Sequence, residues 1–116
     1  MKLSDIKTQL EKCAEIGALR FWESGNTFGL DLPNLGFNWY LGIEAELGEY
    51  YEQSLIIAAL EIFAEARGYL FDFMRLQGDH EAEIWKSGLY CVANGRAPTR
   101  LRAALEAFLN VEWGEK

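Results

Sequence analysis

The sequence predicts an α+β fold in a single domain, residues 1–116, with the element order α-β-β-β-α-β-β-β-α. The main evidence is a pattern that occurs twice, as LEKCAEIGALRF at residues 10–21 and as LEIFAEARGYLF at residues 60–71. Each copy has the apolar spacing of a helix end, then a glycine, then the alternation of a strand. Because the helices and strands are segregated, we expect an antiparallel sheet with the helices mainly on one face.

The first half of the chain is predicted to be a helix followed by three strands. Leu3, Ile6, Leu10 and Cys13 fall at helical spacing, which predicts a helix over residues 4–16 that ends at Gly17. Turn residues and alternating hydrophobicity then predict strands over residues 18–23, 27–32 and 37–46. In the second of these strands, Phe28, Leu30 and Leu32 alternate with small or polar residues and mark a buried face.

The second half repeats this order. A helix is predicted over residues 50–67, with Gly68 ending it, and a helical stripe of Leu101, Leu105, Phe108 and Leu109 predicts the closing helix. Between them, we expect strands over residues 69–76, 80–85 and 89–94, with a tight turn at 86–88. The periodicity of the first of these segments also fits a helix that continues to Met74, so both interpretations stay open there.

Composition limits the classes of partner and compartment. Half of the residues are hydrophobic and a quarter are charged, which is typical of a globular protein. The net charge is −7, so the phosphates of a nucleic acid would repel the chain. No apolar run approaches the ~20 residues of a membrane span, and the N-terminus lacks an apolar signal region. We therefore expect a cytoplasmic protein without nucleic-acid or membrane partners. Cys13 and Cys91 both lie among apolar residues and are expected to be reduced core residues.

The helix over residues 50–67 is apolar around nearly its whole circumference and must be covered on both sides. One interpretation is a core helix between the other two helices. The other is a homodimer in which the outer side packs against a second copy. The predicted dimer interface consists of Leu55, Ile56, Ile57, Leu60 and Phe63.

The strands suggest a surface for a partner protein. If Phe37, Trp39, Leu41 and Ile43 face the helices, the alternate residues of the strands face away from them. The helix-free face would then carry aromatic anchors among carboxylates, which is the usual composition of a binding patch. The candidate partner-binding residues are Trp22, Tyr40, Glu44, Glu46, Glu81, Glu83 and Trp85. The alternative is a solvated sheet face that cross-strand aromatic pairs stabilise.

The sequence predicts no catalytic residue, metal site or cofactor. His80 is the only histidine, no Cys/His cluster exists, and no glycine-rich phosphate-binding motif is present. The alternation of Asp79, Glu81 and Glu83 is typical of a solvated strand face. We therefore expect a protein that is not an enzyme.

The order of elements, the size and the acidic charge resemble a class I chaperone of the type III secretion system. The similarity is carried by TFGLDL at residues 27–32, by the segments LFDFM and WKSGLYCVA, and by RLRAALEAFLNVEW at residues 100–113. The chain differs from that family in having LGEYYEQ before the helix over residues 50–67, and its closing helix is short. The resemblance implies a homodimer through that helix which holds the N-terminal region of a secreted effector in extended form, without ATP.

Two other classes fit parts of the sequence. A small acidic domain with exposed aromatic residues is also typical of inhibitors such as phage anti-CRISPR or toxin-immunity proteins, which imitate phosphate charge. The order α-β-β-β-α within residues 50–111 fits a double-stranded-RNA-binding fold. The net charge argues against that fold, because only Arg96, Arg100 and Arg102 would face phosphates.

Overall fold

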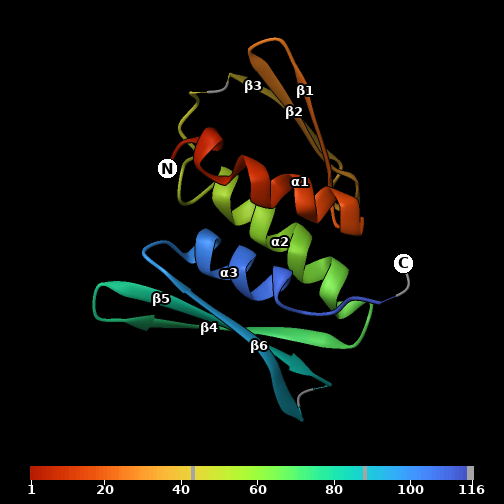
Figure 1. Cartoon of the computed structure of the whole chain (residues 1–116), viewed down its shortest axis with the longest axis vertical. Helices are drawn as coiled ribbons and strands as arrows, with labels where there is room; N and C mark the ends of the chain where they lie inside the picture. Colours follow the sequence, from red (N-terminus) through yellow and green to blue (C-terminus); the bar gives the residue numbers. More distant parts are fainter. Residues whose placement is uncertain (43, 88, 115–116) are drawn as a thin grey trace. The chain divides into compact units, whose positions relative to one another are not determined.

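The computed structural model describes residues 1–42, 44–87 and 89–114, and within them the helices and strands follow the predicted order (Figure 1). The α+β class is therefore confirmed. The chain forms two compact units, Met1–Ala59 and a second that starts at Leu60. Each unit contains one three-stranded antiparallel sheet, ordered β1-β2-β3 in the first unit and β4-β5-β6 in the second. Helix α2, Glu52–Glu65, begins in the first unit and ends in the second.

The first unit opens with a 3-10 turn that leads into a helix, and a meander of three strands follows. Gly17 ends the helix with φ 103°, the left-handed conformation that glycine adopts without strain. Phe28, Leu30 and Leu32 are fully buried, as the alternation of the second strand predicts. The elements are the 3-10 turn Leu3–Ile6, α1 Lys7–Ile16, β1 Arg20–Ser24, β2 Thr27–Leu32, the 3-10 turn Pro33–Leu35 and β3 Phe37–Gly42.

The second unit is a sheet with one helix lying across one of its faces (Figure 1). Gly95 in β6 is buried against the backbone of the helix, where a side chain would meet the carbonyl of Ala103 and the amide of Ala107. The same face contributes Ala82 and Ile84, both fully buried. The elements are β4 Tyr69–Leu76, β5 Asp79–Lys86, β6 Tyr90–Ala97 and α3 Arg100–Leu109.

Aromatic rings join the two ends of the second unit. Trp113 packs edge-on against Phe63 and Tyr69, with ring centroids 5.2 and 5.1 Å away, and it lies 4.6 Å from the ring of Phe108. Its indole Nε1 donates a hydrogen bond of 2.8 Å to the carbonyl oxygen of Phe108. These contacts hold the segment after α3 against the end of α2 and the start of β4.

Local differences from the predicted boundaries have physical causes. Residues 69–76 form a strand, because β4 pairs with β5 along its whole length. Strand β3 ends at Gly42 instead of continuing to residue 46, since Glu44 lies in a turn and Glu46 makes only an isolated bridge with Lys2. The expected helix-facing Ile43, and Gly88 in the predicted tight turn, lie outside the described residues.

The two cysteines occupy different environments. Cys13 is buried in the first unit, and this burial raises the pKa of its thiol to about 12. Cys91 is exposed at the start of β6, so the expectation that it lies in the core is wrong. Its segment is apolar in sequence, but β6 is an edge strand, and an edge strand can leave such residues in solvent.

The cysteines should therefore differ in reactivity. Because the thiolate is the nucleophile, Cys91 should react rapidly with DTNB at pH 8, whereas Cys13 should react only after denaturation. We expect one fast thiol per native chain, measured by absorbance, and no fast thiol in Cys91→Ser. Two fast thiols in the native parent chain would contradict the burial of Cys13.

Candidate protein-binding surface

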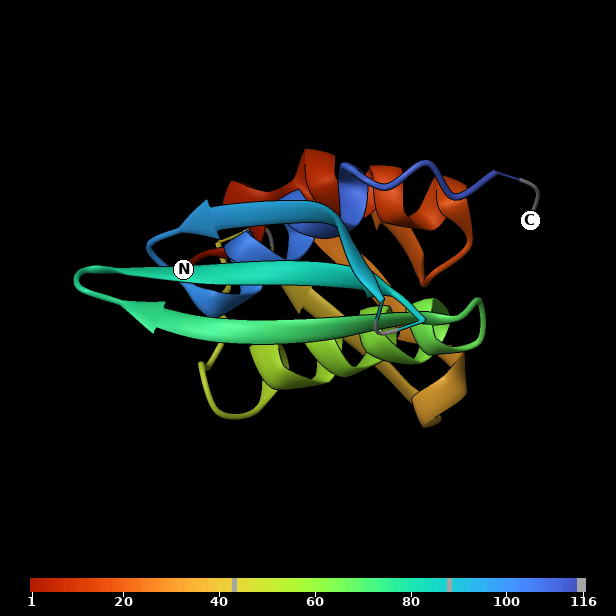
Figure 2. The same cartoon turned by 90° about the horizontal axis from the view of Figure 1, so that it is seen from below.

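Within the second unit, α3 lies on one face of the sheet, and no other described helix of that unit packs on the opposite face (Figure 2). Successive side chains along a strand point to opposite faces of the sheet, so every second residue of β4, β5 and β6 points away from α3. Strand pairing aligns Leu70 with Trp85 and Asp72 with Glu83. We call this surface the open face; it is formed by Leu70, Asp72, Met74, Glu81, Glu83, Trp85, Asn94 and Arg96.

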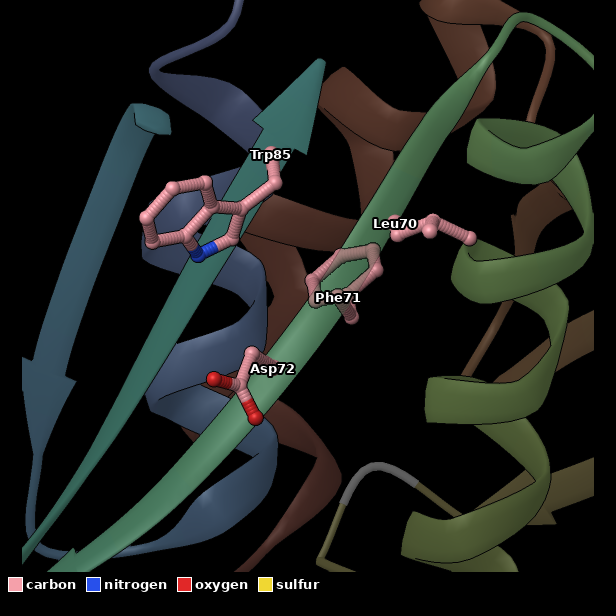
Figure 3. A pocket seen from close by; sticks show the side chains of 4 residues that line it. All are labelled: Leu70, Phe71, Asp72 and Trp85. Atoms are coloured by element: carbon pink, nitrogen blue, oxygen red, sulfur yellow. The ribbon is translucent and has the colours of Figure 1, made fainter. Parts of the chain in front are cut away.

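A hollow of about 360 Å³, open to solvent, lies at the β4 side of this face. Figure 3 shows its lining: Leu70, Phe71 and Asp72 from consecutive positions of β4, and Trp85 from β5. β4 is an edge strand, so side chains that point to either face of the sheet can line a hollow at its outer side. The hollow therefore combines an aromatic ring, apolar side chains and a carboxylate.

The indole of Trp85 is half-buried and held in place by its neighbour. Its Nε1 donates a hydrogen bond of 3.2 Å to Oε1 of Glu83, two residues earlier on the same strand. This bond turns the polar edge of the indole toward the centre of the open face, and it satisfies the only donor of that side chain. The ring is thus oriented before any partner arrives.

The carboxylates of the open face differ in their partners. Arg96 Nε forms an ion pair of 3.1 Å with Asp79, and the Asn94 amide donates a hydrogen bond of 3.3 Å to Glu81. Within residues 1–42, 44–87 and 89–114, neither Asp72 nor Glu83 has an ion-pair partner. The negative charge beside Trp85 is therefore not paired by any cation in the described part of the chain.

Sequence reasoning placed Glu81, Glu83 and Trp85 on this face but missed the contribution of β4. Leu70 and Met74 are 48% and 39% exposed, so β4 adds large apolar side chains to this face. The alternation of Leu70, Asp72 and Met74 along the predicted strand over residues 69–76 was the available signal. The exposed Tyr90 and Val92 at the start of β6, and Leu89 just before it, were also missed.

Trp22 and Tyr40 lie together on the other sheet. They flank Gly29 in one row across β1, β2 and β3, and their rings meet edge to face with centroids 6.1 Å apart. Gly29 is buried under the indole of Trp22, which would collide with any side chain there. The two predicted anchors thus form a local pair in the first unit, whereas Trp85 belongs to a different sheet in the second unit. The expectation of one shared sheet face for all three is wrong.

Glu44 and Glu46 are held by the start of the chain. Lys2 Nζ lies 2.8 Å from Glu44, and the amino group of Met1 lies 3.1 Å from Glu46. Both carboxylates follow β3 and do not belong to a strand face, because β3 ends at Gly42. They are exposed but already paired, so the structure corrects their predicted place on the binding face.

The residues of the predicted dimer interface are mostly buried within a single chain. Ile56 and Leu60 are fully buried, Ile57 and Phe63 are 4% and 5% exposed, and Leu55 is half-buried. This burial favours the interpretation of α2 as a core helix for four of the five residues. The homodimer stays a prediction, and Leu55 is the member of the set that solvent reaches most.

No group of three metal-ligating side chains occurs within the described ranges, and no helix there is long and apolar enough to cross a membrane. His80 is half-buried in β5, opposite Arg75 and Ala97. Comparisons with protein-family models, with curated proteins and with solved structures find no match to this chain.

Proposed function

We propose that this protein is a non-enzymatic binding module that holds an extended segment of a partner protein on its open face. The observation that carries the proposal is the hollow beside Trp85, in which an oriented indole and the exposed Leu70 adjoin Asp72, a carboxylate with no ion-pair partner among the described residues. Large aromatic residues at the centre of a contact and charges around it are the composition that protein interfaces favour. Net charge −7 favours a basic partner.

An extended segment suits this surface because β4 is an edge strand. Its outer backbone groups are available to a further strand, and alternate side chains of that strand would reach the open face. Holding a client in this way fits the secretion-chaperone role that the sequence resembles, with a cytoplasmic location and a homodimer as further parts of the proposal.

Affinity capture from the source cell, with quantitative mass spectrometry, tests the proposal when variants are compared. Trp85→Ala removes the central ring and should lower the captured partner at least about tenfold, because a central aromatic anchor is typically worth about 2 kcal/mol or more. Tyr40→Ala is the matched control, since Tyr40 is a 70% exposed aromatic residue on the other sheet and should leave capture unchanged. Circular dichroism must show both variants folded.

The opposite pattern would contradict the proposal. If Tyr40→Ala abolishes capture while Trp85→Ala leaves it unchanged, the binding surface is the Trp22–Tyr40 pair and not the open face. Equal capture by the parent and both variants would mean that neither aromatic surface binds the partner.

An acidic inhibitor is the second candidate function, favoured by Asp72 and Glu83, which stand opposite each other and pair with no cation among the residues that the structure describes. Carboxylates at such spacing could occupy a groove that normally receives phosphates. The identity of the captured partner separates the candidates: a secreted protein bound through its N-terminal region supports the chaperone, and a nucleic-acid enzyme whose activity falls on binding supports the inhibitor.

A further inference from the structure

We propose that the hollow beside Trp85 is a binding site for a guanidinium group, and that the partner segment inserts an arginine side chain there. This inference rests on the proposed function, which it deepens by naming the chemistry of the contact. The hollow is lined by the Trp85 ring, the carboxylate of Asp72 and the apolar side chains of Leu70 and Phe71. Glu83 lies beside it, opposite Asp72 in the strand pairing and hydrogen-bonded to Trp85.

The first argument is the position of two like charges. Asp72 and Glu83 are directly opposite each other in the β4–β5 pairing, on the open face. Like charges directly opposite each other across a strand pair destabilise a sheet. In the described part of the chain, no cation pairs with either of them. A cation bound between the two strands would remove this repulsion.

The second argument is the aromatic wall. Trp85 is diagonal to Asp72 across the two strands, and the bond from its Nε1 to Glu83 fixes the ring beside the carboxylates. A diagonal pair of this kind lies about 7–8 Å apart, within reach of an aromatic side chain. Tryptophan is also the aromatic residue that attracts a cation most strongly over its face. The ring and the carboxylates therefore attract the same kind of ligand.

Cations of the chain lie over other aromatic rings, but none of the described ones lies over Trp85. The guanidinium of Arg67 lies 3.5 Å from the ring centre of Phe63, and that of Arg100 lies 4.1 Å from the ring centre of Phe73. Lys86, a neighbour of Trp85 in sequence, lies over Tyr69 instead. Across residues 1–42, 44–87 and 89–114, no cation of the chain lies over the Trp85 ring.

A guanidinium fits these groups better than an ammonium. It is planar, so it can stack on the indole, and its five N–H donors can reach two carboxylates at once. Lysine offers a compact, strongly hydrated charge that cannot do both. The aliphatic stem of an arginine would also pack on Leu70 and Phe71, the apolar side of the hollow.

The test uses N-acetyl-arginine amide as the probe and the Trp85 indole N–H signal in ¹H–¹⁵N spectra as the readout. Trp85→Phe identifies that signal among those of the four tryptophans. The uncharged isostere N-acetyl-citrulline amide and the lysine derivative are titrated in parallel. We expect saturable shifts of the Trp85 signal with the arginine probe, binding at least about fivefold weaker with lysine, and no saturation with citrulline.

Variants separate charge from shape. Asp72→Asn should weaken arginine binding at least about fivefold, and so should Glu83→Gln, whose amide oxygen can still accept the indole hydrogen bond. Asp31→Asn is the control, because Asp31 is paired with Arg20 on the other sheet and should leave binding unchanged. Equal binding of the arginine and citrulline probes, or unchanged binding in both carboxylate variants, would overturn the guanidinium site.

These outcomes are distinct from those of the capture experiment. If partner capture depends on Trp85 but the arginine probe does not bind, the proposed function stands and the guanidinium site is wrong. If the arginine probe binds as expected but capture does not depend on Trp85, the site stands and the proposed function fails.

Discussion

Gly95→Ala should lower the melting temperature by roughly 10 °C, which corresponds to a loss of about 2–3 kcal/mol in the free energy of unfolding. The backbone of Gly95 does not require glycine, since its φ is not positive. The cost is steric: the added methyl group would collide with the backbone of α3 at Ala103 and Ala107. A backbone carbonyl and amide cannot rotate away as a side chain can, so the whole helix must move off the sheet.

Thermal unfolding followed by circular dichroism measures this effect. Gly42→Ala is the matched control, because Gly42 also lies in a strand with ordinary φ, and a methyl group there would meet no described atom within 4 Å apart from its neighbours in the chain. That variant should be neutral or slightly more stable, by up to about 1 kcal/mol. Equal melting temperatures for both variants would show that α3 does not pack on β6 at Gly95.

Ile57→Glu should leave the chain unfolded at room temperature, or lower its free energy of unfolding by several kilocalories per mole. Ile57 is 4% exposed in the single chain, and an unpaired charge in such a place is among the most destabilising changes. Native stabilities are only about 5–15 kcal/mol, so this loss is a large part of the total. Urea unfolding monitored by tryptophan fluorescence measures it, and an unchanged midpoint would contradict the burial of this side chain.

Leu55→Glu on the same helix separates folding from dimer formation. Leu55 is half-buried, so a charge there should be tolerated by the single chain but not by a seam between two copies. For the proposed homodimer, light scattering should give twice 13.2 kDa for the parent chain and 13.2 kDa for a folded Leu55→Glu variant. A parent chain that is monomeric at micromolar concentration would reject the homodimer.

Much of the fold could be predicted because the relevant signals are local. The alternation of Phe28, Leu30 and Leu32 predicted a buried face, and all three are fully buried. Gly17 and Gly68 were predicted to end helices, and both have positive φ. Each of these signals depends on a few neighbouring residues, and the geometry of a helix end or a pleated strand acts over that same range.

The candidate site was predicted only in part. Glu81, Glu83 and Trp85 were correctly assigned to one face, since they alternate along a single strand. Their association with Trp22 and Tyr40 was wrong, because it required knowledge of which strands pair. The hollow itself needs Leu70 and Asp72 from β4, and the position of these residues beside Trp85 follows from the β4–β5 register alone.

The sequence by itself determined the order of the elements, their kind everywhere except at residues 69–76, and which residues of each strand share a side. Only the tertiary structure decided that the strands form two sheets, that Lys2 and the amino group of Met1 bind Glu44 and Glu46, and that Asp72 stands opposite Glu83. The physical reason is the distance along the sequence over which each kind of signal acts. Helical and strand periodicity is a property of consecutive residues, whereas strand partners and ion pairs are selected by packing between segments distant in sequence.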